Sequence, residues 1–493
     1  MTKRVGRSSF DRRRREFLER AGAVGVGALL ARGGPLAAAT MEQPFANGAR
    51  ELVTYPGKRP LLRITSRPPH LETPFSAFAE GAITPNDAFF VRYHLGNLPS
   101  NEAVDPAKYR LEVAGSVRTP LRLTLAELKK LAAEEVVAVN QCSGNSRGFF
   151  EPRVFGAQLG NGSMGNARWV GVPLKAVLEK AGVTSAARQV TFDGLDSPVL
   201  PSTSDYIKAL PIEHALSPEV LLAWSMNGAD LPYLNGYPLR LIVPGYFGTY
   251  WVKHLSKIEV LDKDFEGHDA VFMTTGYRVP DNDCWCVPGG AKPERTTPIT
   301  RLKVRSFVTS LPSQSVVTVG ARTEIRGIAF DSGSGIRRVQ LSSDGGRTWT
   351  DATLGRDLGR YSFREWTSSV SPSKPGAFEL KVRAVAQSGE MQPDAATWNP
   401  AGYARNVIES VSLIALPEDA STLTPSQLPG YRTAQLKCGL CHSADYINLQ
   451  PRGLTTAQWS AEMVKMQKTY GAPLSDEEVA QLAEYLAAAY PSR

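Results

Sequence analysis

The residues with the clearest chemistry in this 493-residue chain are its five cysteines, two of which stand in a short motif near the carboxyl end. Cys438-Gly-Leu-Cys441-His442 has the spacing that attaches a c-type haem through two thioethers and offers the histidine as an axial iron ligand. The alternative for two cysteines at this spacing is a bare redox pair. The motif predicts one covalent haem c, attached to Cys438 and Cys441, with His442 on the iron.

A second axial ligand must come from further along the chain. No histidine follows His442, so methionine is expected, and the methionines downstream are Met463 and Met466. Both lie on the amphipathic stretch 456–468, where a methionine commonly serves only to fill a core. Met466 is favoured, because KMQKTYGAP followed by a helix resembles the distal side of small monohaem cytochromes c. Methionine ligation would keep the haem potential high, as suits an electron acceptor.

The other three cysteines occupy different settings. Cys284 and Cys286 flank Trp285 in a turn-rich segment, where we expect a structural role, such as a disulfide that closes a very small loop; two free thiols are the alternative. Cys142 lies in the run QCSGNSR and, taken alone, is typical of a buried apolar thiol. Arg147 at the end of that run would favour the thiolate, which is a soft ligand for a transition metal.

Composition limits the class of protein. With 42% hydrophobic and 21% charged residues the chain is neither disordered nor collagenous, and a mean hydropathy of −0.21 argues against a polytopic membrane protein. A net charge of +8 would suggest an anionic partner, but most of this charge lies at the amino terminus. Residues 1–39 hold nine Lys or Arg against three Asp or Glu, a net +6. Residues 40–493 therefore carry only +2, and no nucleic-acid partner is expected.

The basic amino terminus has the layout of a twin-arginine signal peptide. Arg14-Arg15 precedes a short, Gly- and Ala-rich apolar run at 21–30, and Ala37-Ala38-Ala39 offers a cleavage site. The run is too short to span a bilayer, which takes roughly 20 residues. A basic disordered arm is the alternative. We expect export to the periplasm and no membrane span in the mature protein.

Sequence patterning divides the rest of the chain. Residues 40–295 alternate β-branched runs with helical patterns at Leu123–Leu131 and Leu174–Ala181, which predicts an α+β domain. Residues 296–416 show short alternating stretches between turns, with a hairpin expected at Asp344-Gly345, and favour an immunoglobulin-like β-sandwich. Residues 417–429 read as a linker, and 430–493 as a small all-α cytochrome c domain.

Several separated motifs resemble one family. QCSGNSR looks like the molybdenum-ligand loop of the sulfite oxidase family, and TPNDAFFVRYHLGNLP at 84–99 resembles that family's cofactor-site segment. Residues 159–183, 234–260 and 273–283 are similar to its bacterial sulfite dehydrogenase branch. The resemblance covers roughly 55–415, and the haem motif matches a subset with a fused cytochrome. It implies a sulfite oxidase fold, a molybdenum-molybdopterin cofactor and a homodimer formed through the sandwich domain.

The resemblance also implies roles for individual residues. Cys142 becomes the molybdenum ligand, Arg92 and Arg147 the substrate-pocket arginines, Tyr277 the active-site tyrosine, and His94 a group that tunes the arginines. The positions matched to cofactor binding are Phe90, Val91, Arg92, Tyr93, His94, Asp196, Asn235, Arg240, Trp251, Val252 and Lys253.

Three positions depart from the vertebrate pattern. Tyr93 replaces an asparagine, Asn235 a histidine, and Leu159 a pocket tryptophan. These departures leave the cofactor contact of Asn235 and the shape of the anion site open.

The expected chemistry agrees with these residue types. Sulfite is a small dianion without a hydrophobic part, so its affinity has to come from cations such as Arg92 and Arg147; a structural ion pair is the alternative for either arginine. Tyr277 and His94 could instead be packing residues. We expect sulfite oxidation to sulfate, with electrons passing singly through the haem to an external cytochrome c. The alternatives are a molybdenum enzyme for another oxyanion or sulfur species, and an electron carrier that no longer binds molybdenum.

Overall fold

The computed structural model describes residues 39–418 and 423–491. The predicted signal peptide, residues 1–39, therefore lies outside the described residues except for its last position. Within the described ranges, no helix is long and apolar enough to cross a membrane.

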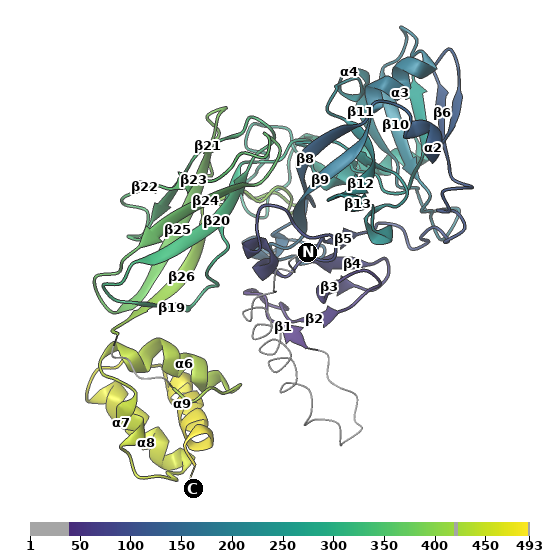
Figure 1. Ribbon diagram of the computed structural model, residues 1–493. Coiled ribbons are helices and arrows are strands. Elements are labelled where there is room, and N and C mark those ends of the chain that lie inside the picture. Colours follow the sequence, from purple (N-terminus) through teal and green to yellow (C-terminus); the bar gives the residue numbers. More distant parts are fainter. Residues whose placement is uncertain (1–38, 419–422, 492–493) are drawn as a thin grey trace, which may run out of the picture. The chain divides into compact units, whose positions relative to one another are not determined.

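Strands dominate the chain up to residue 298 (Figure 1). Three sheets follow the connectivity β1-β2-β3-β4-β5, β11-β10-β15-β6-β7 and β13-β12-β9-β8, with β14 on β12, and a fourth pairs β16 with β17. The strands of the first sheet are β1 (Thr40–Met41), β2 (Arg50–Val53), β3 (Leu61–Thr65), β4 (His70–Glu72) and β5 (Val91–Arg92). Those of the second are β6 (Arg110–Gly115), β7 (Leu121–Thr124), β10 (Gln189–Gly194), β11 (Lys208–Pro211) and β15 (Leu255–Leu261). The others are β8 (Glu134–Gln141), β9 (Met164–Pro173), β12 (Leu221–Met226), β13 (Ala229–Asp230), β14 (Arg240–Ile242), β16 (Arg278–Pro280) and β17 (Thr296–Pro298).

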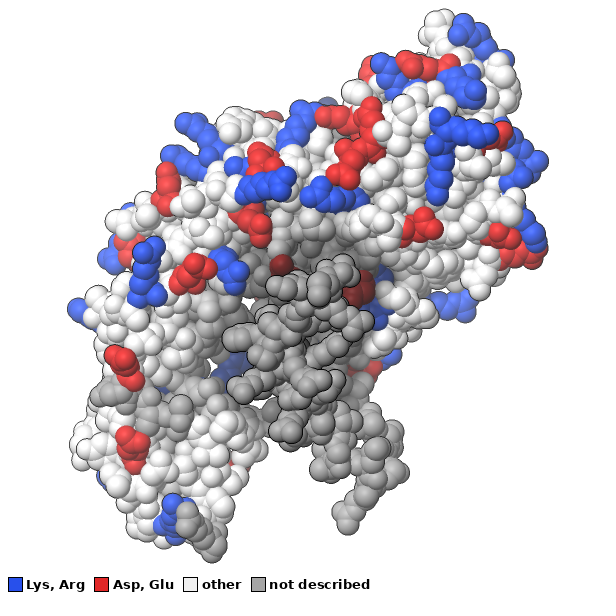
Figure 2. Space-filling view, viewed as in Figure 1, with Lys and Arg blue, Asp and Glu red and all other residues white. Residues whose placement is uncertain are grey.

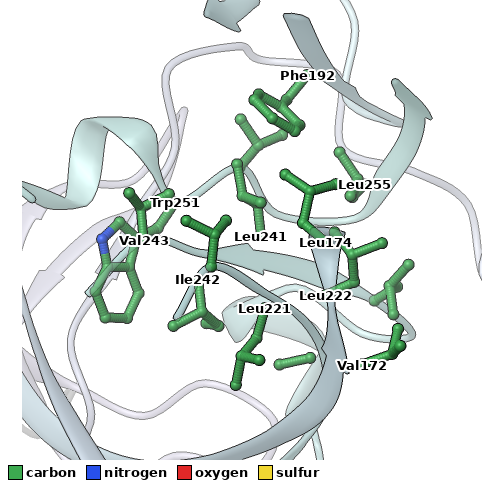
Figure 3. Close-up of a cluster of buried hydrophobic side chains, with 14 of the residues drawn as sticks. Val172, Leu174, Phe192, Leu221, Leu222, Leu241, Ile242, Val243, Trp251 and Leu255 are labelled. Atoms are coloured by element: carbon green, nitrogen blue, oxygen red, sulfur yellow. The ribbon is translucent and has the colours of Figure 1, made fainter. Parts of the chain in front are cut away.

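One apolar core joins the second and third sheets. β12 has the nearly continuous apolar sequence LLAWSM because both of its faces are covered. Figure 3 shows side chains of β9, β12, β14 and β15 converging with Trp251 and Phe192. Burying such side chains contributes roughly 1.5–3 kcal/mol each, so this core fixes the strand ends from which the site residues project.

Helices in this region are short. α3 (Leu174–Ala181) has the predicted bounds, and it ends at Gly182 with φ +70°, where a β-carbon would lie 2.7 Å from the Arg118 guanidinium. The helix predicted over Leu123–Leu131 was wrong in length. β7 extends to Thr124, whose side chain caps the four-residue helix α2 (Leu125–Leu128). The remaining two are α4 (Ile212–Ala215) and α5 (Val271–Thr274).

Residues 305–416 form two sheets around a second apolar core. One sheet has the order β18-β20-β24-β23, and the other β19-β26-β25-β21-β22. Their strands are β18 (Arg305–Val308), β19 (Ser315–Thr318), β20 (Thr323–Phe330), β21 (Ile336–Ser342), β22 (Thr350–Asp351), β23 (Thr353–Leu354), β24 (Arg364–Val370), β25 (Gly376–Ala386) and β26 (Glu409–Leu416). The turn predicted at Asp344-Gly345 joins β21 to its antiparallel partner β22. The immunoglobulin-like classification stays a prediction.

The carboxyl-terminal part is helical, as predicted. Its helices are α6 (Pro429–Lys437), α7 (Asp445–Asn448), α8 (Thr456–Lys468) and α9 (Asp476–Ala489). α8 coincides with the amphipathic stretch found in the sequence, and a capping box between Thr455 and Gln458 starts it. Trp459 and Met463 of α8 pack on Leu482 and Leu486 of α9.

Surface charges are mixed. On the face shown in Figure 2, Lys and Arg side chains alternate with Asp and Glu and form no continuous patch. This agrees with the net +2 of residues 40–493.

Candidate functional site

A cavity lies where β5, β8 and β10 end and β14 begins. It brings together side chains that are up to 188 positions apart in the chain. Its lining residues are Phe89, Phe90, Arg92, His94, Asn140, Cys142, Ser143, Asp196, Tyr206, Leu234, Asn235, Arg240, Gly248, Thr249, Trp251, Lys253 and Tyr277. Most of the predicted cofactor and catalytic residues are in this set.

A hydrogen-bonded loop presents the Cys142 thiol to this cavity. Cys142 follows the last residue of β8, its backbone N–H donates to the Ser163 carbonyl at 2.9 Å, and its carbonyl accepts from the N–H of Asn145 at 3.0 Å. The Asn145 side chain accepts in turn from the Ser163 N–H at 3.0 Å. The buried Glu72 carboxyl holds the far side of the loop, through Ser163 Oγ at 2.9 Å and the Gly160 N–H at 3.1 Å. Cys142 is a free, partly buried thiol in a fixed position.

Buried cations define the electrostatics of the cavity. Arg240 is held by the carbonyls of Asn235 and Trp251 at 2.8 and 3.2 Å, and its guanidinium lies over the Trp169 ring at 5.0 Å. Lys253 donates to the carbonyl of Arg92, and Arg92 donates to the carbonyl of Tyr93. Burial lowers the pKa of Arg240 to about 9 and that of Lys253 to about 7. Such a set of desolvated cations needs an anionic partner.

The unpartnered atoms of the lining test whether a pterin cofactor with a phosphate fits. Among the described residues, Asn140 Oδ1, Ser143 Oγ and Arg240 Nε are buried without a hydrogen-bond partner. Buried polar groups are nearly always bonded, so these atoms indicate a polar ligand. Gly248 adds space, because a β-carbon there would lie 2.2 Å from Asn140 Oδ1. A soft thiol, buried cations and unmatched donors and acceptors together fit a sulfur-ligated, anionic, many-atom group.

His94 and Tyr277 meet at one wall of the cavity. His94 Nε2 is hydrogen-bonded to the Tyr277 hydroxyl, and the imidazole stacks on the Tyr206 ring at 3.9 Å between centroids. Burial, followed by the charge of Arg92, lowers the His94 pKa well below its usual value. Burial also raises the Tyr277 pKa. His94 and Tyr277 are therefore both uncharged in the hydrogen bond that joins them.

Four predicted site residues do not line the cavity. Val91 and Tyr93 face the small core under the first sheet, where the Tyr93 hydroxyl meets His254 Nε2 at 2.7 Å. Val252 packs in the main core. Arg147 is not among the lining residues and donates from Nε to the carbonyl of Ala401 at 3.2 Å. Strand alternation explains Val91, because neighbouring residues of a strand point to opposite faces.

Tyr206 and Lys208 are among the residues of the site that were not predicted from the sequence. Tyr206 lines the cavity behind His94. Lys208 is buried next to it, with Nζ 2.6 Å from the Phe272 carbonyl and 5.3 Å from the centroid of the Tyr277 ring. Burial lowers the Lys208 pKa to about 7. No local pattern marks either residue, because the spacing that brings them to the site is set by the second sheet.

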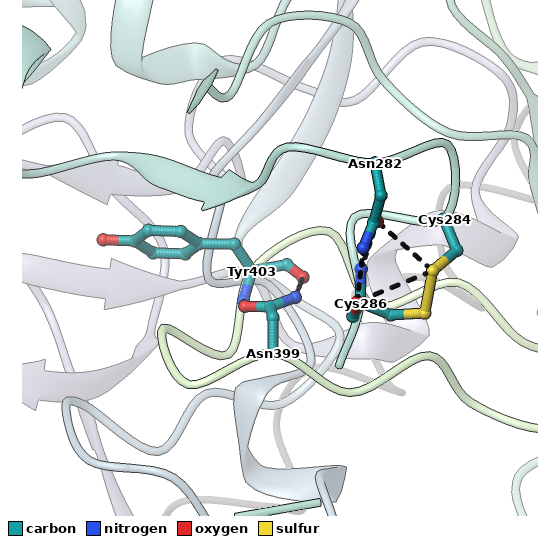
Figure 4. The surroundings of a disulfide bond; sticks show 5 residues. All are labelled: Asn282, Cys284, Cys286, Asn399 and Tyr403. Atoms are coloured by element: carbon teal, nitrogen blue, oxygen red, sulfur yellow. Dashed lines mark hydrogen bonds between the residues drawn. A yellow bond between two sulfur atoms is a disulfide. The ribbon is translucent and has the colours of Figure 1, made fainter. Parts of the chain in front are cut away.

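Two further expectations concern residues near the site. Cys284 and Cys286 form the disulfide, and the Asn282 side chain binds the Cys286 backbone at both its N–H and its carbonyl (Figure 4). Leu159, in place of the vertebrate tryptophan, is buried and does not line the cavity.

A second cavity, of about 640 Å³, lies within residues 437–486. Cys438, Cys441 and His442 line it together with both Met463 and Met466 of α8. Met463 is buried and Met466 is partly buried. Because both line the cavity, the lining does not show which of them would be the axial ligand. The rest of the lining is mainly apolar: Ala444, Tyr446, Ile447, Trp459, Tyr470, Ala472, Leu474, Leu482 and Leu486, with Lys437, Gln450, Glu462 and Lys465. Two thiols, an imidazole and a thioether around an apolar space are compatible with a haem.

Comparisons with known proteins bear on the first cavity. The chain matches the oxidoreductase molybdopterin binding domain over residues 96–269 and the Mo-co oxidoreductase dimerisation domain over 296–415. It is 35% identical to the sulfite oxidase of Gallus gallus, over 74% of this chain and 79% of that protein. With the mitochondrial sulfite oxidase of Homo sapiens the identity is 34%, over 73% and 67% respectively. Among solved structures, the sulfane dehydrogenase SoxCD from Paracoccus pantotrophus is similar, with a TM-score of 0.60 and 25% identity over 78% of this chain and 92% of that one. Its fold, its molybdopterin-binding domain and these relatives make the chain a member of the sulfite oxidase family of molybdenum oxidoreductases.

Proposed function

We propose that this chain is a periplasmic sulfite dehydrogenase, which converts sulfite and water to sulfate, two protons and two electrons. The observation that carries the proposal is the fixed Cys142 thiol in a buried cavity lined with cations. A small dianion gains the most binding free energy where the cations that contact it are desolvated and already in position. Residues 1–39, read as a twin-arginine signal, support export.

The cofactor would be held from several directions. Cys142 would be the thiolate ligand, and the other residues that line the cavity and match the family's cofactor positions are Phe90, Asp196, Asn235, Trp251, Arg240 and Lys253. Asn235 is itself fixed by the Lys58 ammonium, which lies 2.6 Å from Oδ1. When bound, molybdenum supplies the oxygen-atom transfer and takes up the electron pair.

The chain's own residues then attract and orient the anion. Arg92 lines the cavity and supplies a cation that pairs with an oxyanion through charge-assisted hydrogen bonds. Tyr277 stays protonated, so its hydroxyl can donate to an anionic oxygen when it leaves His94. His94, neutral in this environment, adds no charge of its own and orients the Tyr277 hydroxyl through their hydrogen bond.

A covalent haem c would carry the electrons out one at a time to an external cytochrome c. Cys438, Cys441 and His442 line one cavity with the predicted ligand Met466, and this arrangement supports the assignment. The dimerisation domain matched over residues 296–415 supports a homodimer.

Rapid mixing of the metal-analysed protein with sulfite, without oxygen, tests the proposal. One molybdenum and one iron per chain are expected, and the haem band should become reduced within a turnover. A haem band that stays oxidised while molybdenum is reduced contradicts the internal relay, and iron without molybdenum leaves only an electron carrier.

Oxidation of a sulfane sulfur is a second candidate, and the similarity to SoxCD favours it. Parallel assays with sulfite, thiosulfate and nitrate separate the candidates. Cytochrome c serves as acceptor for the first two substrates, and a reduced dye as donor for nitrate. We expect turnover with sulfite at least about tenfold above the others, a difference of 1.4 kcal/mol in transition-state binding.

A further inference from the structure

Residues 399–404 belong to the segment that matches the dimerisation domain. They form a tight loop that contacts Tyr277 and the segment that follows Cys142. The Asn399 side chain closes the loop, donating from Nδ2 to the Tyr403 carbonyl at 2.9 Å and accepting from the Tyr403 N–H at 3.1 Å (Figure 4). Gly402 has φ +60°, and a β-carbon there would lie 2.4 Å from the Val154 side chain. The loop thus has one backbone conformation, which fixes the direction of the Tyr403 side chain.

This loop is bonded to the segment that carries Cys142. The Ala404 N–H donates to the carbonyl of Ser143 at 3.0 Å, one residue after the thiol. Arg147, five residues after the thiol, donates from Nε to the Ala401 carbonyl at 3.2 Å. The position of the loop is therefore tied to the Cys142 loop at two points.

The Tyr403 ring contacts Tyr277, which lines the cavity, and Arg147, which the family resemblance places in the anion site. It stacks on the Tyr277 ring with centroids 5.5 Å apart and planes 8° apart, and the Arg147 guanidinium lies over it at 5.1 Å. In the part of the chain that the structure describes, Arg147 bonds to two carbonyls and this ring and to no carboxylate. Its charge is thus available to an anion, and its place depends on the aromatic surface beneath it.

We propose that Tyr403 is a positioning residue of the anion site. Its ring holds the Arg147 guanidinium beside Tyr277, the tyrosine that lines the cavity, and so sets the field that attracts a small oxyanion. The inference deepens the proposed function and rests on it. Tyr403 does not line the cavity and acts through Arg147 and Tyr277. The Tyr403 ring carries this role, because both contacts are made by its face.

Tyr403→Leu and Tyr403→Phe in the full-length holoenzyme test the inference. Leu removes the face that carries the guanidinium, and we expect a KM for sulfite raised about tenfold, with kcat per molybdenum within about threefold. Calorimetric titration of the oxidised enzyme with sulfate should show the same tenfold weakening. Phe keeps the ring, so both quantities should stay within about twofold of the wild type.

Tyr361→Leu is the matched control. Tyr361 is also a buried tyrosine with an arginine on its ring, Arg360 at 4.8 Å, and its hydroxyl binds Glu219. We expect this variant to lose stability without a change in sulfate affinity. Equal weakening of sulfate binding by Tyr361→Leu, or a fall in kcat without a rise in KM for Tyr403→Leu, overturns the inference.

Two provisions keep the test decisive. If Tyr403→Leu fails to fold or to load molybdenum, Asn399→Ala loosens the same loop, and sulfate affinity unchanged from the wild type then refutes the role. Sulfate titration requires no turnover, so an enzyme that binds sulfate but does not oxidise sulfite refutes the proposed function alone. The Tyr403 comparison still stands on the sulfate data in that case.

Discussion

The two cavities of this chain are built in opposite ways. The first draws its lining from residues 89–277, and its walls carry buried cations and unmatched polar atoms. The second is lined from residues 437–486, mostly by apolar side chains, and three of its chemically active residues stand in one five-residue motif. A site made by a motif is visible in the sequence, whereas a site made by a fold becomes visible only when the strands are paired.

Electrostatics separate the cavities further. Burial lowers the pKa values of Arg240, Lys253 and His94 around the first, so the folded chain carries a desolvation cost that an anionic cofactor offsets. In the second, burial raises the pKa of the Cys438 thiol to about 11. The first cavity is therefore adapted to a charged ligand and the second to an apolar one, and each should fail independently when its own sulfur is removed.

Cys142→Ser should produce the largest effect. Losing the thiolate should reduce sulfite oxidation by at least about a thousandfold, because the metal performs the reaction. The haem spectrum should stay that of the wild type. Steady-state assays with cytochrome c, together with visible spectra, measure both quantities.

The control is the paired change Cys284→Ser and Cys286→Ser, which removes the disulfide between the exposed Cys284 and the partly buried Cys286. Activity should stay within about twofold of the wild type, since neither residue lines the cavity. A Cys142→Ser enzyme that still turns over sulfite would contradict the ligand role.

The paired change Cys438→Ala and Cys441→Ala should break the second cavity alone. Without the thioethers no covalent haem forms, and sulfite-dependent reduction of cytochrome c should fall about a hundredfold. Sulfite oxidation with a small dye acceptor should stay within about twofold. If both activities fall together while the molybdenum content is unchanged, the two cavities are not independent.

The same contrast explains what the sequence could predict. Leu174–Ala181 and Thr456–Lys468 were predicted with their bounds because an apolar stripe and flanking caps or glycine define them locally. The motif from Cys438 to His442 can be recognised from five consecutive residues, without knowledge of the fold. Leu123–Leu131 was predicted as one helix, but its first two residues pair in β7, which local periodicity cannot show.

The residues of the first cavity were predicted through family resemblance. That prediction was incomplete, because a match in sequence does not show in which direction a side chain points. Arg147 and Tyr93 stand at matched positions, yet neither lines the cavity. Lys208 and Tyr403 were missed because their partner Tyr277 lies 69 and 126 positions away in the sequence. Their contacts depend on how the sheets and the 399–404 loop come together, and no spacing rule encodes that.

Met466→Ala and Met463→Ala sharpen the description of the second cavity. Loss of an axial thioether should lower the haem potential by about 0.1 V, a small part of the roughly 0.8 V that axial ligands span. We expect this for Met466→Ala. Met463→Ala should mainly destabilise α8 against α9, since Met463 belongs to that core. Redox titration of the haem band decides, and a drop for Met463→Ala alone reverses the assignment.

The smallest expected effect concerns acid stability, where the two cavities should again differ. His254 follows Lys253, which lines the first cavity, and has Nδ1 2.6 Å from the Tyr237 carbonyl and Nε2 2.7 Å from the Tyr93 hydroxyl. It is fully buried, and burial lowers its pKa to about 3. The last 64 residues contain one histidine, the exposed His442.

Because the unfolded chain binds a proton at His254 near pH 6.5 and the folded chain only near pH 3, stability contributed by neutral His254 is complete above pH 6.5 and falls as pH drops below it. Between pH 7 and pH 5 this one group should cost about 2 kcal/mol. His254→Gln should flatten that slope, as measured by urea unfolding followed by tryptophan fluorescence at both pH values. The haem band should report a second transition that moves little with pH. Parallel slopes for wild type and variant would show that His254 takes up its proton at the same pH in the folded and the unfolded chain, and the acid sensitivity would then belong to other buried groups of the first cavity.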